Sequence, residues 1–171
     1  NPAVKTNLTN GRTTQTRYRY VHLNADVKHI DLSQPLLLRS FNESTRKEGF
    51  YHLAVASKQL TKRLEGDFKL GATIRKALNT DDLIYTKETF QEYPNWQLTD
   101  LSFKQSQQIT TANPQQSEYK WGTVELVNWT ASDGTPLQGL LYKPENFDPT
   151  KKYPMMTYFY ERNSDNIHTH F

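Results

Sequence analysis

The sequence contains no cysteine and only 7 glycines in 171 residues. Without cysteine, neither a disulfide framework nor a thiolate metal site can form. No stretch approaches the roughly 18 consecutive apolar residues that a membrane-spanning helix requires. The first residues also lack the apolar core of a signal peptide. We therefore expect a chain without disulfides and without a membrane span.

Apolar residues are scarce as well, at 35% of the chain, whereas aromatic residues reach 12%. Globular domains usually run nearer to half apolar, but disordered chains are poor in aromatic residues. The aromatic content therefore indicates a folded protein with a polar surface.

The net charge is +3, and the excess lies in residues 1–30, which carry five Lys/Arg against Asp26 alone. Such a basic stretch could contact nucleic acid. Tyr18 and Tyr20 alternate with Arg17 and Arg19, however, and this period of two is typical of a β-strand. We interpret the stretch as a strand and expect no nucleic-acid partner.

Short runs rich in Thr, Tyr, Val and Ile recur along the chain, separated by polar turns. These residues suit a pleated, half-buried surface. The connectors are too short for a parallel crossover, so the pattern predicts antiparallel pairing of consecutive strands. The predicted strands span residues 16–23, 35–41, 50–56, 60–64, 71–78, 82–87, 96–101, 107–110, 123–130 and 136–142.

The rhythm of these strands resembles part of a β-propeller. Residues 71–110 place four strands in a length typical of one blade, and residues 35–64 match the last three strands of a preceding blade. A closed ring needs about four blades or more. We therefore expect residues 1–117 to form the C-terminal part of a propeller, about two blades long, within a larger protein.

The character of the sequence changes after a linker at residues 113–116. Asp133 and Gly134 separate two apolar runs, which is a strong hairpin signal. Residues 153–160 are apolar on both faces, a pattern that favours a strand buried within a larger sheet. We therefore assign residues 118–171 to a second, truncated domain.

Few patterns in the chain indicate chemistry. No glycine has a serine two positions later, so the nucleophile elbow G-x-S-x-G is absent, as are phosphate loops and the H-E-x-x-H motif. His168 and His170 could share a strand face and bind a metal, but no third ligand is evident. We expect these histidines to be solvated, and we expect neither metal nor cofactor.

Trp96, Trp121 and Trp129 could form a platform on which a sugar stacks. Large aromatic side chains in a β domain more often belong to a core or an interface. Only a cluster on one exposed face would favour a carbohydrate ligand.

Residues 113–171 resemble the passage from propeller to hydrolase in the prolyl oligopeptidase family of serine peptidases, nearest to its dipeptidyl peptidase IV and acylaminoacyl-peptidase branch. The motifs that carry the resemblance are NPQ at 113–115, VELVNWTASDGTPLQGLLYKPENFDPTKKYP at 124–154 and MMTYFYERNSD at 155–165. The resemblance implies a mainly β fold, with antiparallel strands of a partial propeller followed by the first strands of an α/β-hydrolase domain.

The resemblance also implies a role for Tyr160, whose hydroxyl would help to form the oxyanion hole. The alternative is an aromatic side chain that packs at the end of a strand. Glu161, Arg162 and Asn163 follow where the family often has small residues. The family's catalytic Ser, Asp and His would lie beyond this segment, so this chain holds no triad.

The function implied by the resemblance is that of a fragment of a serine peptidase that hydrolyses short peptides and is not catalytic by itself. Its partner would be a peptide substrate, a homo-oligomer is a further expectation, and an exported location is slightly favoured. The alternative from another class is a non-catalytic β-rich module that binds a glycan or a protein through exposed aromatic residues.

Overall fold

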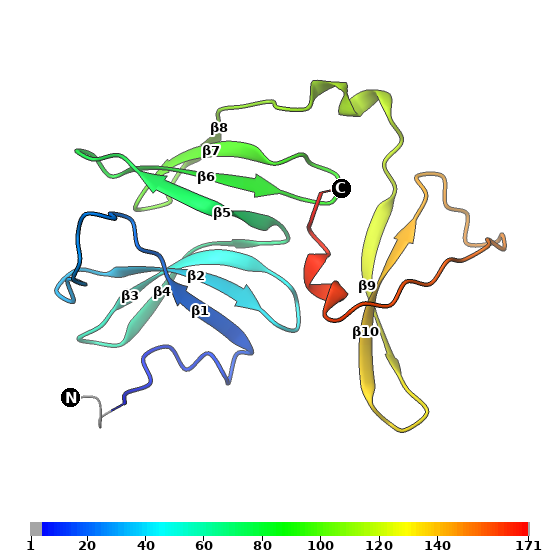
Figure 1. Ribbon diagram of the computed structural model, residues 1–171, viewed down its shortest axis with the longest axis horizontal. Helices are drawn as coiled ribbons and strands as arrows, with labels where there is room; N and C mark the ends of the chain where they lie inside the picture. The colour runs from blue at the N-terminus through cyan, green and yellow to red at the C-terminus, as the bar shows by residue number, and fades with distance from the viewer. Residues whose placement is uncertain (1–4, 171) are drawn as a thin grey trace.

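The computed structural model describes residues 5–170, which form three antiparallel sheets and two short 3-10 helices (Figure 1). Within these residues, two sheets have four strands each and the third is a two-stranded hairpin. The elements are β1 (Thr16–Tyr20), β2 (Leu36–Asn42), β3 (Glu48–Ala54), β4 (Gln59–Gly66), β5 (Lys69–Lys76), β6 (Asp82–Glu88), β7 (Asn95–Asp100), β8 (Ser106–Gln108), η1 (Pro114–Glu118), β9 (Thr123–Thr130), β10 (Pro136–Lys143) and η2 (Asn163–Asn166).

Strand order follows sequence order in both four-stranded sheets, β1-β2-β3-β4 and β5-β6-β7-β8. Each neighbour is antiparallel, as short connectors require. The prediction of a mainly β fold with sequential antiparallel pairing is therefore confirmed. The four strands expected in residues 71–110 form one sheet, and in the first sheet β1 precedes the three strands expected in residues 35–64.

The core lies between the two four-stranded sheets. Phe50 of β3 contacts Tyr85 of β6 edge-on at 5.5 Å between ring centroids and Phe103 at 5.0 Å. Leu70 and Leu83 are each 1% exposed beside them. Because neither sheet has a helix on this side, each sheet is buried by the other.

A partly buried ion pair of the first sheet also bonds to the second sheet. The Arg39 guanidinium of β2 donates to Glu48 Oε2 of β3 at 2.6 Å and, through Nη1, to the Gly71 carbonyl of β5 at 2.9 Å. Arg39 also donates to the Leu70 carbonyl, and the Leu70 N–H donates to Glu48 Oε2 at 3.1 Å. Glu48 is 8% exposed, so these bonds satisfy a charge that burial would otherwise penalise.

The third sheet is the hairpin that the Asp-Gly signal predicts. β9 and β10 pair from Thr123↔Lys143 to Thr130↔Pro136. Gly134 has φ +85°, in the left-handed region that glycine enters without a steric penalty. Sequence and structure agree here to within one residue at each strand end.

The α/β-hydrolase part of the expected fold is wrong. Residues 5–170 contain no α-helix, only η1 and η2, so none of the helices that cover an α/β-hydrolase sheet is present in the described part. No closed propeller is seen in these residues either. No described helix has the length and apolarity needed to cross a membrane.

The strand expected at residues 153–160 is also not formed. The segment is extended but pairs with no described strand, and Met156 and Phe159 are 95% and 85% exposed. Its apolar pattern predicts burial within a sheet, but pairing decides strand formation, and no described strand edge pairs with it. The domain boundary near residue 117 stays a prediction; η1 occupies the expected linker, and the outer ends of the two expected domains, residues 1–4 and 171, lie outside the described range.

We expect Glu48→Gln to lower the free energy of unfolding by about 2 kcal/mol. Breaking a buried pair typically costs about 3–5 kcal/mol, and the Arg39 side chain is 30% exposed, which reduces the penalty. Urea unfolding followed by circular dichroism measures the change.

The matched control is Glu125→Gln. Glu125 and Lys143 are also 2.6 Å apart, but the Glu125 side chain is 49% exposed, so its loss should cost less than about 1 kcal/mol. If both variants lost the same free energy of unfolding, the contacts of Glu48 would not be what connects the two sheets.

Candidate functional site

The segment after β10 returns across the hairpin and brings η2 beside both β10 and the first sheet (Figure 1). Arg46, in the turn between β2 and β3, anchors it. Its guanidinium donates to Gln138 Oε1 of β10 at 2.6 Å and to Ser164 Oγ of η2 at 2.9 Å. Residues more than 90 positions apart thus meet at one point.

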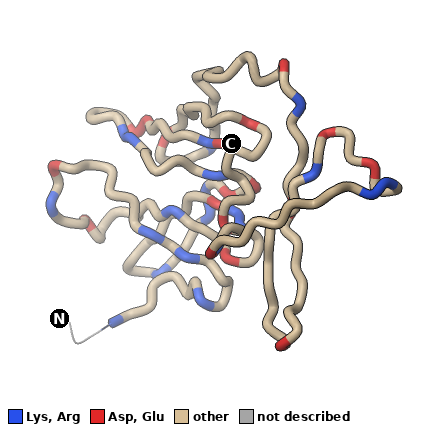
Figure 2. The backbone as a smooth tube through the Cα atoms, turned by 45° about the vertical axis from the view of Figure 1, so that its right-hand side comes forward, with Lys and Arg blue, Asp and Glu red and all other residues tan. Residues whose placement is uncertain are grey.

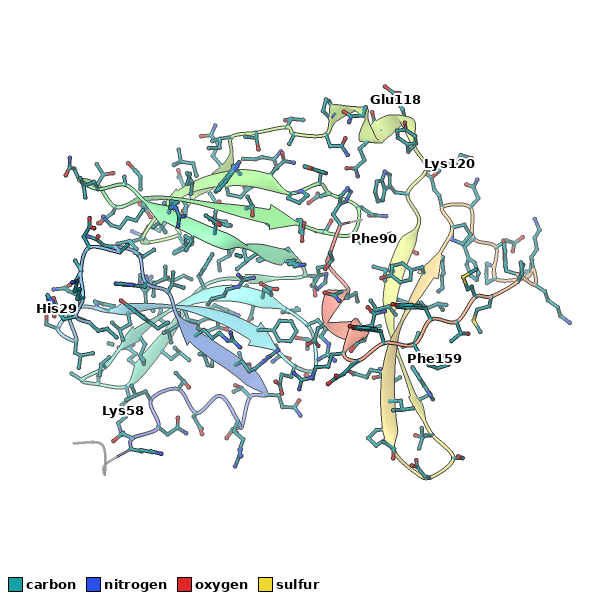
Figure 3. The ribbon with its side chains drawn as sticks, in the orientation of Figure 1. His29, Lys58, Phe90, Glu118, Lys120 and Phe159 are labelled. Carbon is teal, nitrogen blue, oxygen red and sulfur yellow. The ribbon has the colours of Figure 1, made fainter. Side chains whose placement is uncertain are left out.

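An apolar groove of about 720 Å³ lies between β10 and residues 154–160. Trp129 is 48% exposed and Tyr158 is 73% exposed on its walls. Phe159, labelled in Figure 3, belongs to the segment that crosses the hairpin. A groove of this size is in the range of small-molecule and peptide pockets. Further lining residues are Val127, Leu137, Leu140, Leu141, Tyr142, Met155, Met156 and Tyr160.

A smaller, charged pocket of about 200 Å³ adjoins the groove; we call it the arginine pocket. Arg17 Nε is 3.0 Å from Glu43 Oε1, and Arg46 Nε is 3.4 Å from Asp165 Oδ1. Six residues line it, namely Arg17, Glu43, Arg46, Arg162, Ser164 and Asp165.

Local turn chemistry positions Arg46. The Asn42 side-chain oxygen accepts hydrogen bonds from the Ser44 and Thr45 N–H groups, which holds the turn after β2 tight. Arg46 then adopts φ +63°, and its side chain is only 9% exposed. Few non-glycine residues adopt this conformation, so the surrounding contacts must maintain it.

The groove and the arginine pocket are adjacent, because Arg162 and Ser164 line both. The site offers apolar walls and, at one end, guanidinium groups. Among residues 5–170, no Ser or Thr hydroxyl is hydrogen-bonded to a histidine, and no group of three metal-ligating side chains occurs. The arrangement can therefore bind a ligand, but it holds no activated nucleophile in the described part.

Tyr160 lies on the groove wall. It is 74% exposed, and its ring is nearly parallel to that of Tyr158 at 6.4 Å. Its assignment to an oxyanion hole stays a prediction.

His168 and His170 were expected to be solvated, but both are partly buried in the structure. The His170 ring stacks on Trp121 at 4.5 Å between centroids, and His170 Nδ1 is 3.1 Å from the carbonyl oxygen of Phe90, labelled in Figure 3. His168 is half-buried, and desolvation lowers its pKa while the nearby Asp67 carboxylate partly offsets that effect. These contacts tie the end of the described chain to the second sheet.

The three tryptophans serve different contacts. Trp121 also meets Phe90 edge-on at 6.0 Å. The Trp129 ring covers Gly139, where a Cβ atom would lie 3.1 Å from the indole, so the absence of a side chain at Gly139 leaves room for the ring. Trp96 lies half-buried in β7. Of the three, only Trp129 lines the apolar groove.

Sequence reasoning missed the arginine pocket. Arg17, Arg46 and Arg162 come from separate parts of the chain and share no motif. Lys/Arg and Asp/Glu are interspersed over the structure, so charge density does not reveal the pocket (Figure 2). The polar residues at Asn42 signal the turn that presents Arg46, but not the distant partners of Arg46.

No protein-family model matches the chain, and no curated protein matches it. Solved structures of the AtxE2 isopeptidase are similar in fold. One is a variant with Astexin3-dC4 bound, with a TM-score of 0.50, 12% identity, and coverage of 82% of this chain and 26% of that chain. The other is the apo form, with a TM-score of 0.48, 13% identity and the same coverage. The chain spans about a quarter of the length of these proteins.

The resemblance of residues 113–171 to the prolyl oligopeptidase family is wrong, together with the α/β-hydrolase and serine-protease assignment that depends on it. Apart from the two short 3-10 helices, the regular elements of the described residues are all strands, so the hydrolase helices are missing, and the solved structure with a similar fold is that of an isopeptidase. An Asp-Gly turn between apolar runs specifies a hairpin in any fold. The matched motifs therefore report local structure rather than a family.

We expect stability to fall as the pH is lowered from about 7.5 to about 5. Desolvation lowers the pKa of His168 and of His52 in the folded state, so below about pH 6.5 the unfolded chain binds protons that the folded chain does not. His168→Gln should flatten the dependence, measured by urea unfolding at both pH values. A slope unchanged by this substitution would contradict the assignment to His168.

Proposed function

We propose that this chain is the peptide-binding, non-catalytic β portion of a peptide-bond hydrolase. The observation that carries the proposal is the apolar groove between β10 and residues 154–160, which ends at the arginine pocket. An extended peptide fits such a site because its side chains can contact the walls while its backbone remains accessible to polar groups.

The walls of the groove support this interpretation. β9 and β10 form a two-stranded sheet, so each strand has one side without a partner strand in the described residues. Met155, Met156 and Phe159 present large apolar side chains to solvent. Exposed apolar patches of this kind mark interaction surfaces, and methionine adapts to varied side chains.

The fold comparison supports the hydrolase part of the proposal. The structure that is similar in fold over 82% of this chain is that of an isopeptidase, AtxE2, with Astexin3-dC4 bound in the solved variant. We assign the chemical step of the proposed hydrolase to groups other than residues 5–170. Tyr160, exposed on the groove wall, is the one described residue for which an oxyanion role is proposed.

A glycan- or protein-binding module is the second candidate function. A separate hollow of about 590 Å³ favours it, since Tyr93, Tyr119 and Trp121 line this hollow together with polar side chains. Tyr119 is 68% exposed and could stack on a sugar ring. Binding of oligosaccharides rather than peptides would favour this candidate.

We expect the chain to bind an apolar peptide with both ends blocked. The probe is fluorescein-labelled Gly-Ser-Leu-Phe-Val with an amidated C-terminus, and fluorescence anisotropy gives its Kd. Phe159→Ser should weaken binding about tenfold, because the loss of one central aromatic contact typically costs about 1 kcal/mol or more.

The matched control is Leu78→Ser, which removes a side chain of similar exposure, 81% against 85%, outside the groove. It should leave Kd unchanged. Mass spectrometry should recover the peptide intact, since the described residues hold no activated nucleophile. Equal weakening by both substitutions, or cleavage by this chain, would contradict the proposal.

A further inference from the structure

The arginine pocket has a free positive charge. Arg17 pairs with Glu43 and lies 3.8 Å from Asp165, and Arg46 pairs with Asp165. Arg162 lines the same pocket and makes no ion pair with any residue in the range 5–170. Three guanidinium groups thus face two carboxylates, which leaves the pocket one negative charge short of neutrality.

The backbone supports a functional interpretation of this charge. Arg162 has φ +55° and Arg46 has φ +63°, so two arginines of one pocket adopt the left-handed conformation. This conformation is uncommon for non-glycine residues and clusters at binding and active sites. Arg46 is only 7% exposed, so its side chain is a largely buried part of the pocket lining.

We propose that the arginine pocket binds the C-terminal carboxylate of a peptide whose preceding apolar side chains occupy the groove. The inference rests on the proposed peptide-binding function. It adds the direction of the bound peptide, whose C-terminus would lie in the arginine pocket. The groove and the pocket share Arg162 and Ser164, so a peptide end that leaves the groove would lie beside the Arg162 guanidinium.

The chemistry of the pocket suits a carboxylate. Arginine presents a planar fork that matches the two oxygens of a carboxylate, and such charge-assisted hydrogen bonds are stronger than neutral ones. Arg162 would supply the fork, while Ser164 Oγ lies at the same end, held by Arg46 at 2.9 Å. A volume of about 200 Å³ leaves room for a terminal carboxylate.

Glu43 is a competitor for the same charges. Its side chain is 50% exposed, and it pairs with Arg17 at the pocket. An incoming carboxylate would meet its negative charge at short range. Removing the Glu43 charge should therefore strengthen carboxylate binding, which a purely structural role of the Arg17–Glu43 pair does not explain.

The test compares two forms of the peptide Gly-Ser-Leu-Phe-Val, one with a free C-terminal carboxylate and one amidated, by fluorescence anisotropy. We expect the free acid to bind about tenfold more tightly, as one charge-assisted contact provides. Arg162→Asn should abolish the difference in affinity between the two peptides. Asparagine tolerates the left-handed backbone, so this variant keeps the turn.

The matched control is Arg75→Gln, which removes an exposed arginine of β5 outside the pocket and should preserve the preference. Glu43→Gln should increase the preference for the free acid. Equal binding of the two peptides, or an equal loss in the Arg75 variant, would overturn the carboxylate site while the peptide-binding function stands. Failure of both peptides to bind would overturn the peptide-binding function itself.

Discussion

The bond network between Arg39 and Glu48 sets the relation of the two four-stranded sheets. It joins β2 and β3 to the first residues of β5, where it satisfies the Leu70 N–H and the carbonyls of Leu70 and Gly71. Buried backbone groups need such partners. Because the network fixes where the second sheet begins, it also determines which side chains meet in the core between the sheets.

The same region organises the candidate site. Arg46 lies two residues before Glu48 and holds η2 and β10. Lys69 lies one residue before Leu70, and its Nζ donates to Thr169 Oγ1 at 3.0 Å. These two polar anchors of the C-terminal segment therefore depend on the placement of the junction between the sheets, although the groove itself lies on the hairpin.

Local signals predicted most of the fold. Alternating residues such as Arg17 to Tyr20 indicated β1, and Asp133 and Gly134 fixed the hairpin, because strand pairing across short connectors is a local property. The apolar run at 153–160 misled the prediction because periodicity does not reveal whether a partner strand exists. The arginine pocket was beyond reach, since contacts between positions as far apart as 46 and 164 depend on the complete fold.

The groove has one wall from the hairpin and one from residues 154–160. The segment after β10 is held by polar contacts at Arg46 and Lys69 and, at its end, by the contacts of His170. A detached segment would leave only half of a binding surface. Such a detachment would compete with ligand capture. The observed affinity for any ligand would equal the intrinsic affinity multiplied by the attached population, so solution conditions that weaken those two anchors would act as remote regulators of binding.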